Sequence, residues 1–134
     1  MRHIVISGAS HGLGAALAQA FAAPGTRLFL TSRSAEALAK VAQFCRDAGV
    51  KVEILACDIR DPASLAPALL AFDDTAPADL IIANAGTSSG SSLEGVPEAY
   101  GAAITQIEVN LIGAMALIGP LLPRLRGRGH APSC

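Results

Sequence analysis

Short apolar runs alternate along this chain with longer segments whose apolar residues recur at helical spacing. The apolar runs predict four β-strands, at residues 3–7, 27–31, 51–56 and 80–83. The spaced segments predict helices over 13–22, over 34–45, from 61 onward, and over 97–124. Strict alternation of strand and helix predicts an α/β fold, with a parallel sheet and right-handed crossover connections.

Capping residues and helix breakers support these boundaries. Ser34 and Asp61 are typical N-cap residues, and Asp61 is followed by Pro62 at the first helical position. The long final helix is expected to bend near Gly113 or Pro120. The first helix is predicted to bury one stripe of side chains, formed by Leu13, Leu17 and Phe21.

Composition and charge limit the classes of partner. Apolar residues make up 51% of the 134 positions and charged residues 16%, which favours a well-buried single domain over 1–134. A net charge of -1 and an aromatic content of 4% predict no nucleic-acid partner. Arg124, Arg126 and Arg128 are interpreted as a solvated helix terminus. The apolar stretch 109–122 is too short for a bilayer span, so no membrane partner is expected.

The cysteines bear on the cellular compartment. Cys45, Cys57 and Cys134 show no disulfide framework and no metal-ligand spacing, so reduced thiols and no metal site are expected. Cys45 and Cys57 are predicted to be small core residues. The first residues lack the layout of a signal peptide. Together these features predict a cytoplasmic protein.

A glycine-rich turn joins the first predicted strand to the first predicted helix. Gly8, Gly12 and Gly14 follow the spacing G-x-x-x-G-x-G. Glycines at such a junction permit tight turning and let backbone N–H groups and the helix N-terminus approach a pyrophosphate. A dinucleotide site is therefore predicted here, and a purely structural tight turn is the alternative.

Four motifs in this chain resemble those of the short-chain dehydrogenase/reductase family. Residues 7–14, Ser-Gly-Ala-Ser-His-Gly-Leu-Gly, resemble the family's T-G-x-x-x-G-[IL]-G, with serine in place of the usual threonine. Three further matches follow in the family's order: Asp58 after the third strand, Asn84-Ala85-Gly86 after the fourth (with Ala83 in place of the first Asn of N-N-A-G), and Asn110 in the long helix. The resemblance implies the N-terminal part of a doubly wound, Rossmann-like fold. It also implies an oxidoreductase that moves hydride between a nicotinamide cofactor and a carbonyl/alcohol substrate.

The resemblance also implies individual roles. Asp58 would accept a hydrogen bond from the adenine amino group, although it could instead cap a loop. Asn84 would hold the central strand, although it could be a simple turn residue. Gly86 would let the nicotinamide ribose pass close by, and Asn110 would support a proton relay. Within the polar Ser/Gly loop 87–95, Ser88 to Ser92 could line a substrate loop, and a flexible connector is the alternative.

The end of the second strand indicates which cofactor is preferred. NAD-binding proteins place a carboxylate there, whereas this chain carries Ser32, Arg33 and Ser34. Arg33 could bind a 2′-phosphate through charge-assisted hydrogen bonds, and His11 could add a second contact, so NADP(H) is expected over NAD(H). A solvated Arg33 and a purely capping Ser34 are the alternative. The full predicted cofactor-binding set is Gly8, Ser10, His11, Gly12, Leu13, Gly14, Ser32, Arg33, Ser34, Asp58, Ile59, Asn84, Ala85 and Gly86.

The family's catalytic Ser, Tyr and Lys have no counterpart among these residues. The single tyrosine, Tyr100, is followed four positions later by Ile104, so the chain contains no Y-x-x-x-K. Of the family's reaction residues only Asn110 is matched. After Gly129 the expected fifth strand is replaced by His-Ala-Pro-Ser-Cys. We interpret the chain as a truncated or frameshifted member that is inactive by itself.

Three functional hypotheses follow. The chain is the NADP(H)-binding portion of a short-chain oxidoreductase, a non-catalytic dinucleotide-binding module, or a decayed remnant. The fourth strand is expected to form an apolar sheet edge. Self-association as a homo-oligomer is expected through the helix over 97–124, because members of the family commonly associate through that helix.

Overall fold

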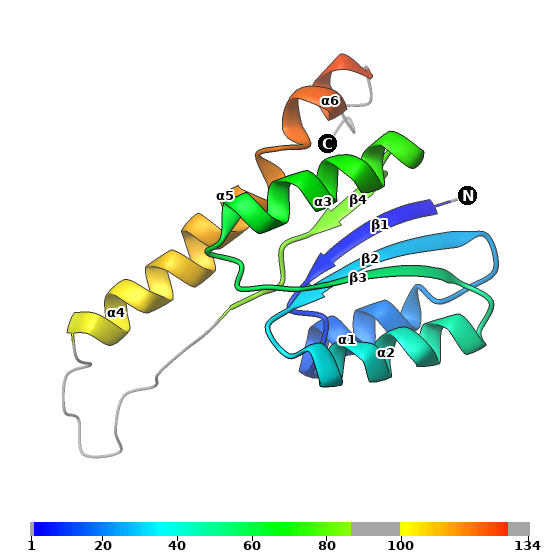
Figure 1. Ribbon diagram of the computed structural model, residues 1–134, viewed down its shortest axis with the longest axis horizontal. Helices are drawn as coiled ribbons and strands as arrows, with labels where there is room; N and C mark the ends of the chain where they lie inside the picture. Colours follow the sequence, from blue (N-terminus) through cyan, green and yellow to red (C-terminus); the bar gives the residue numbers. More distant parts are fainter. Residues whose placement is uncertain (1, 87–99, 129–134) are drawn as a thin grey trace.

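The computed structural model describes residues 2–86 and 100–128. Its strands form one parallel sheet in the order β3-β2-β1-β4, which confirms the predicted α/β fold. The strands are β1 (Arg2–Ser7), β2 (Thr26–Ser32), β3 (Lys51–Ala56) and β4 (Leu80–Ile82). Because all strands run the same way, their carboxyl ends meet at one edge of the sheet, from which the polypeptide turns into the helices (Figure 1).

Helices cover both faces of this sheet. Helices α1 (Gly12–Ala20) and α2 (Ala35–Asp47) pack on one face, whereas α3 (Pro62–Thr75) and α5 (Gly113–Ile118) pack on the other (Figure 1). Strand β1 lies between the two layers, and its residues Ile4, Val5 and Ile6 are fully buried. Side chains alternate between the faces of a strand, so Ile4 and Ile6 join one core and Val5 joins the other.

The predicted caps are confirmed, and the predicted stripe of α1 is confirmed at Leu17 and Phe21, which pack against the core, but not at Leu13. The Ser34 hydroxyl accepts a hydrogen bond from the Ala37 N–H at 3.3 Å, and the Asp61 carboxylate accepts one from the Ser64 N–H at 3.3 Å. Leu13, however, is 67% exposed. The face of α1 that meets the sheet carries Gly14 and Ala18 instead, because the helix approaches the strands too closely for large side chains.

Where the structure describes it, the predicted long helix over 97–124 is a continuous helical run over Tyr100–Ile118, followed after a break by one short helix. Helix α4 (Tyr100–Ile107) continues through a π-helical turn, η1 (Glu108–Ile112), into α5. The chain then leaves helical geometry around Pro120 before α6 (Leu122–Gly127) begins. The bend predicted near Gly113 or Pro120 is therefore a π-turn just before the first and a break at the second. Residues 97–99 lie outside the described part of the chain.

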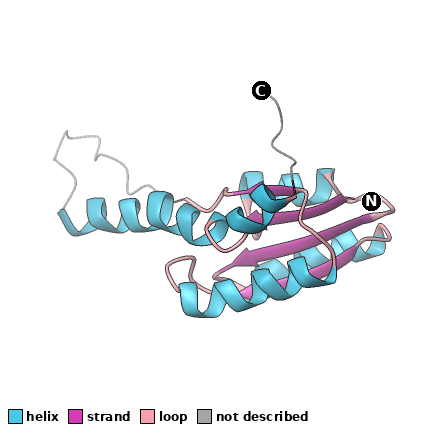
Figure 2. Ribbon diagram, turned by 90° about the horizontal axis from the view of Figure 1, so that it is seen from above, coloured by secondary structure: helices cyan, strands magenta, loops and turns pink. Residues whose placement is uncertain are grey.

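The helical run from α4 to α5 projects beyond the carboxyl edge of the sheet (Figures 1 and 2). Helix α4 has no buried residue, and exposed apolar side chains follow the run, at Tyr100, Ile104, Ile107, Leu111, Ile112 and Met115. Residues Tyr100–Ile118 are long and apolar enough to cross a membrane by length and composition. Length therefore does not exclude a membrane span, contrary to our expectation. Length and composition alone do not show a membrane span, because core helices of soluble proteins can have the same length and hydropathy.

The basic run near the end of the described chain is not simply a solvated terminus. Arg124 Nη1 lies 3.1 Å from Asp73 Oδ2, and Arg128 Nη1 lies 3.0 Å from Asp73 Oδ1. The Asp73 side chain is completely buried, and its Oδ1 also accepts the Ala78 N–H at 2.8 Å. Two of the three arginines thus hold α6 against the end of α3. The sequence does not indicate these ion pairs, because a partner about fifty residues away leaves no local pattern.

Candidate functional site

The glycine turn has the geometry that its spacing predicts. Gly8 and Gly12 adopt φ angles of +65° and +54°, a region that favours glycine. Gly14 sits where helix α1 meets the turn, and a Cβ there would collide with the Gly8 carbonyl oxygen and lie 2.6 Å from Asn84 Nδ2. The N-cap residue of α1, His11, forms no side-chain capping hydrogen bond. Within residues 2–86 and 100–128, no N-cap side chain therefore accepts from the first N–H groups of the helix.

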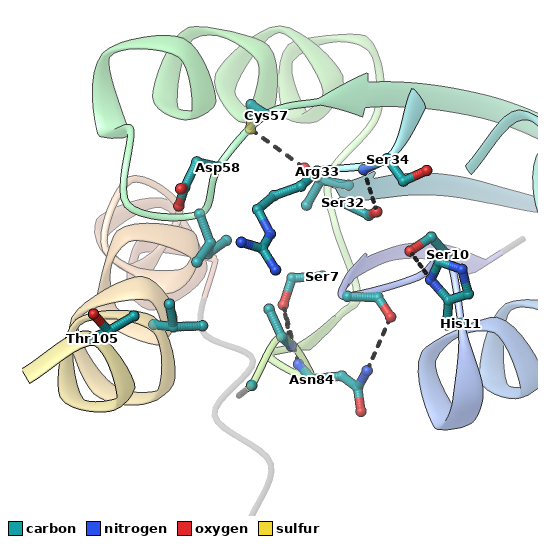
Figure 3. A pocket seen from close by; sticks show the side chains of 16 residues that line it. Ser7, Ser10, His11, Ser32, Arg33, Ser34, Cys57, Asp58, Asn84 and Thr105 are labelled. Carbon is teal, nitrogen blue, oxygen red and sulfur yellow. Dashed lines mark hydrogen bonds between the residues drawn. The ribbon is translucent and has the colours of Figure 1, made fainter. Parts of the chain in front are cut away.

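Two hydrogen-bonded contacts join the glycine turn to the end of β4. The Ser7 hydroxyl accepts hydrogen bonds from the backbone N–H groups of Asn84 and Ala85, at 3.1 and 3.0 Å. The Asn84 side-chain amide donates to the Gly8 carbonyl oxygen at 3.3 Å (Figure 3). Asn84 is thus more than a turn residue, because it bridges the ends of β1 and β4.

A cleft of about 380 Å³ opens at this carboxyl edge of the sheet. It is lined by Ser7, Gly8, Ser10, His11, Thr31, Ser32, Arg33, Ser34, Cys57, Asp58, Ile59, Asn84, Ala85, Gly86, Thr105 and Val109. Every residue of the predicted cofactor-binding set lines the cleft except Gly12, Leu13 and Gly14. Those three belong to the start of α1, beside the cleft. The structure therefore gathers residues from five separate stretches of sequence around one cavity.

Some residues of the lining were missed by sequence reasoning. Thr31 and Cys57 stand at or just after the ends of β2 and β3, and ligands of parallel sheets bind at strand carboxyl ends, so this rule could have identified them. Cys57 is only half-buried, and its Sγ lies 3.5 Å from Thr31 Oγ1, whereas Cys45 is fully buried as predicted. Thr105 and Val109 come from the α4–η1 run, and no sequence signal placed them here.

Charged and polar groups gather at the β2–β3 side of the cleft. The exposed Arg33 extends its guanidinium across the cavity, with Asp58 on the opposite wall (Figure 3). The Ser32 hydroxyl accepts the Ser34 N–H at 3.2 Å, so both serines stand beside Arg33. At the glycine turn, Ser10 Oγ lies 2.8 Å from His11 Nδ1. This end of the cleft offers hydroxyl, imidazole and guanidinium groups to an anion.

Asp58 contributes an ionised carboxylate to the cleft wall. Hydrogen bonds from the Arg60 side chain, and then from its backbone N–H, lower the pKa of Asp58 to about 2. Arg60 in turn places its Nη1 3.2 Å from Glu108 Oε2, at the start of η1. The loop that follows β3 is thereby tied to the π-turn.

Asn110 lies within η1 and faces the end of β4. A Cβ added to Gly86 would stand 3.3 Å from Asn110 Oδ1, so the glycine permits this close approach. Asn110 lies in the helical run, as predicted, but it is exposed and its turn has π-helical geometry. Such turns occur frequently at functional sites.

The sheet order, the uncapped helix after β1 and the cleft at the strand ends define a Rossmann-like, doubly wound α/β protein. Comparison with known families makes the assignment more specific. The model of the short chain dehydrogenase family matches residues 2–131. The chain belongs to the short-chain dehydrogenase family.

Individual relatives agree with this assignment. 3-Dehydrosphinganine reductase TSC10B of Arabidopsis thaliana is 33% identical over 98% of this chain and 39% of its own length. The structure of an alcohol dehydrogenase from Thermococcus sibiricus, complexed with 5-hydroxy-NADP, has a TM-score of 0.82 and 31% identity, covering 96% of this chain and 55% of that one. Carveol dehydrogenase from Mycobacterium avium, solved with NAD, has a TM-score of 0.83 over 97% of this chain and 51% of that one, and at 23% identity it shows the fold alone. The chain spans about 40–50% of the relatives that it matches.

Proposed function

We propose that the cleft binds a nicotinamide dinucleotide, with NADP(H) preferred over NAD(H). The observation that carries this proposal is the uncapped N-terminus of α1 beside a glycine turn, at the edge where β1 and β4 both end. Free N–H groups and the positive end of the helix dipole suit a pyrophosphate. At Gly8, Gly14 and Gly86 any side chain would press on a neighbouring atom, so glycine permits the close packing of backbone there.

The proposed orientation follows from the chemistry of the cleft walls. Arg33, with Ser32 and Ser34, offers the charge and hydroxyl groups that a ribose 2′-phosphate requires. Asp58 would accept the adenine amino group, and the Asn84–Gly86 segment would lie beside the nicotinamide half. The T. sibiricus relative solved with 5-hydroxy-NADP supports the phosphate preference.

We further propose that the chain is the cofactor-binding portion of an oxidoreductase acting on a carbonyl/alcohol pair. NADP(H), when bound, supplies or accepts the hydride, and the residues described here bind and orient it. The single tyrosine, Tyr100, is 83% exposed at the start of α4, with Ile104 where a lysine would be required. We therefore expect cofactor binding without turnover by these 134 residues. Measurable NADPH oxidation against a panel of carbonyl compounds would contradict this expectation.

Arg33→Ala should weaken NADPH binding by about tenfold to a hundredfold while leaving NADH binding nearly unchanged, because only NADPH carries the 2′-phosphate. Titration of both cofactors by isothermal calorimetry measures the two dissociation constants. Lys40→Ala is the matched control, since it removes one exposed positive charge on α2 outside the cleft. Equal losses for both cofactors, or no loss for NADPH, would show that the assignment of the phosphate site is wrong.

We also propose self-association through the α4–η1–α5 run, supported by its exposed apolar side chains. Leu111 is 59% exposed and Met115 is 65% exposed on this run. Leu111→Lys should shift the chain toward monomer in sedimentation velocity, because a lysine ammonium would be buried in the contact. Phe44→Lys on α2, at a side chain with 53% exposure, is the control and should leave the distribution unchanged. A wild-type chain that sediments as a monomer at high concentration would exclude the proposal.

A further inference from the structure

Both oxygens of the Asp58 carboxylate already accept hydrogen bonds from one residue, Arg60. Its Oδ1 accepts from the Arg60 backbone N–H at 2.9 Å and from Arg60 Nε at 3.0 Å. Its Oδ2 accepts from Nε at 3.2 Å and from Nη2 at 2.7 Å. A carboxylate offers about four lone-pair positions, and three N–H groups of Arg60 compete for them, with Nε–H shared between the two oxygens. An amino group that approaches Asp58 from the cleft therefore competes with Arg60 for the carboxylate.

Arg60 has a second partner to which it could move. Its Nη1 lies 3.2 Å from Oε2 of Glu108, a residue that does not line the cleft. A shallow hollow of about 490 Å³ adjoins this pair and is lined by Asp58, Arg60, Asp61, Glu108 and Ile112. The side chains of Arg60 and Asp58 are 35% and 34% exposed, so neither is locked by packing. The guanidinium thus has both room and an alternative acceptor.

We propose that Arg60 is an exchangeable cover on the adenine-binding carboxylate, released onto Glu108 when an adenine amino group binds Asp58. The inference rests on the proposed function, because it takes the cleft to hold an adenine dinucleotide. Arg60 then acts as a specificity-determining residue: it lowers the advantage of a base that carries an amino group over one that carries a carbonyl. Occupancy of the adenine end also changes the contacts of Glu108, the first residue of the π-turn that carries Asn110.

Substitution of Arg60 and substitution of Glu108 should have opposite effects on dinucleotide binding. Arg60→Met frees Asp58 and should tighten binding of an adenine dinucleotide. Glu108→Gln removes the charge that receives Arg60, so the cover stays on Asp58 and binding should weaken. When Arg60 is already absent, Glu108→Gln should have no effect. A residue that merely stabilises the loop would not give this pattern of signs.

The experiment compares NADPH with its hypoxanthine analogue, reduced nicotinamide hypoxanthine dinucleotide phosphate, in which a carbonyl replaces the amino group. Dissociation constants are measured by calorimetry for the full 134-residue chain, for Arg60→Met, for Glu108→Gln and for the double variant. The ratio of the two constants cancels any general loss of positive charge near the phosphates. We expect Arg60→Met to raise the preference for NADPH by about tenfold, and Glu108→Gln to lower it by about threefold. Lys40→Met, the control on α2, should leave the ratio unchanged.

The outcomes separate the two proposals. Binding of NADPH by the wild-type chain with a ratio that Arg60→Met leaves unchanged or lowers would overturn the role of Arg60 and leave the proposed function intact. A Glu108→Gln effect that persists in the Arg60→Met background would also overturn it. A wild-type chain that binds neither dinucleotide would overturn both. Thermal unfolding of each variant shows that the compared proteins are folded.

Discussion

Gly14→Ala is expected to lower the free energy of unfolding by about 3 kcal/mol or more and to abolish dinucleotide binding. The added Cβ would collide with the Gly8 carbonyl oxygen and press on the Asn84 amide, two groups that hold the glycine turn to β4. The Gly8 carbonyl oxygen is part of the backbone and cannot rotate away from the new Cβ. Relief of the collision therefore requires that α1 move away from the sheet. Chemical denaturation and NADPH titration measure the two effects.

Gly101→Ala is the matched control for this substitution. Gly101 is also helical, in α4, and a Cβ there meets no atom of the described residues within 4 Å. Alanine is favoured over glycine in a helix by up to about 1 kcal/mol, so this variant should be neutral or slightly stabilised. A Gly14→Ala protein as stable as Gly101→Ala would show that α1 is not in close contact with the turn.

Asp73→Asn should lower the free energy of unfolding by about 2–3 kcal/mol at neutral pH, because it leaves Arg124 and Arg128 without the buried charge between them. Both arginines keep about a third of their side chains in solvent, which limits the loss. Asp74→Asn is the control: Asp74 also contacts Arg124, but it is 65% exposed, and surface pairs contribute little. Equal effects of the two substitutions would contradict the importance of burial.

The ion pairs of Asp73 also predict how the free energy of unfolding depends on pH. Burial raises the pKa of Asp73, but hydrogen bonds from Arg128, the Ala78 N–H and Arg124 outweigh it and lower the pKa from 3.8 to about 2. A pKa that is lower in the folded state favours the ionised form, so the stabilisation is present above about pH 4 and is lost as pH falls toward 2. The difference in unfolding free energy between wild type and Asp73→Asn should therefore shrink over that range. A difference that stays constant from pH 6 to pH 2 would show that the carboxylate charge is not responsible.

The parts of the fold that are encoded locally were predicted well. Apolar runs in the sequence predict the buried strands. Ser34 and Asp61 each form the cap that their residue type predicts. Most of the candidate cleft was also predictable, because parallel strands bring their carboxyl ends together and the motif residues follow those ends.

What the sequence did not reveal depends on contacts between distant segments. Nothing near Arg124 or Arg128 indicates that Asp73 is their partner, and nothing near Thr105 indicates that it reaches the cleft. The exposure of Leu13 follows from how closely α1 approaches the sheet, which periodicity alone does not determine. The π-turn at Glu108–Ile112 has helical composition, so its wider winding leaves no trace in the hydrophobic pattern.

The position of β4 has a consequence for the order in which the chain folds. The pairs of β1 with β2 and of β2 with β3 join residues separated by one short crossover, whereas Ile4 pairs with Leu80 across most of the sheet-forming sequence. Loop closure over longer separations is slower, so the three-strand unit should form before β4 docks. The three-strand unit also leaves the ribosome before β4 does, so it can begin to fold first during synthesis. The halves of the cleft therefore arise at different times, and the last strand to dock is the one that supplies Asn84.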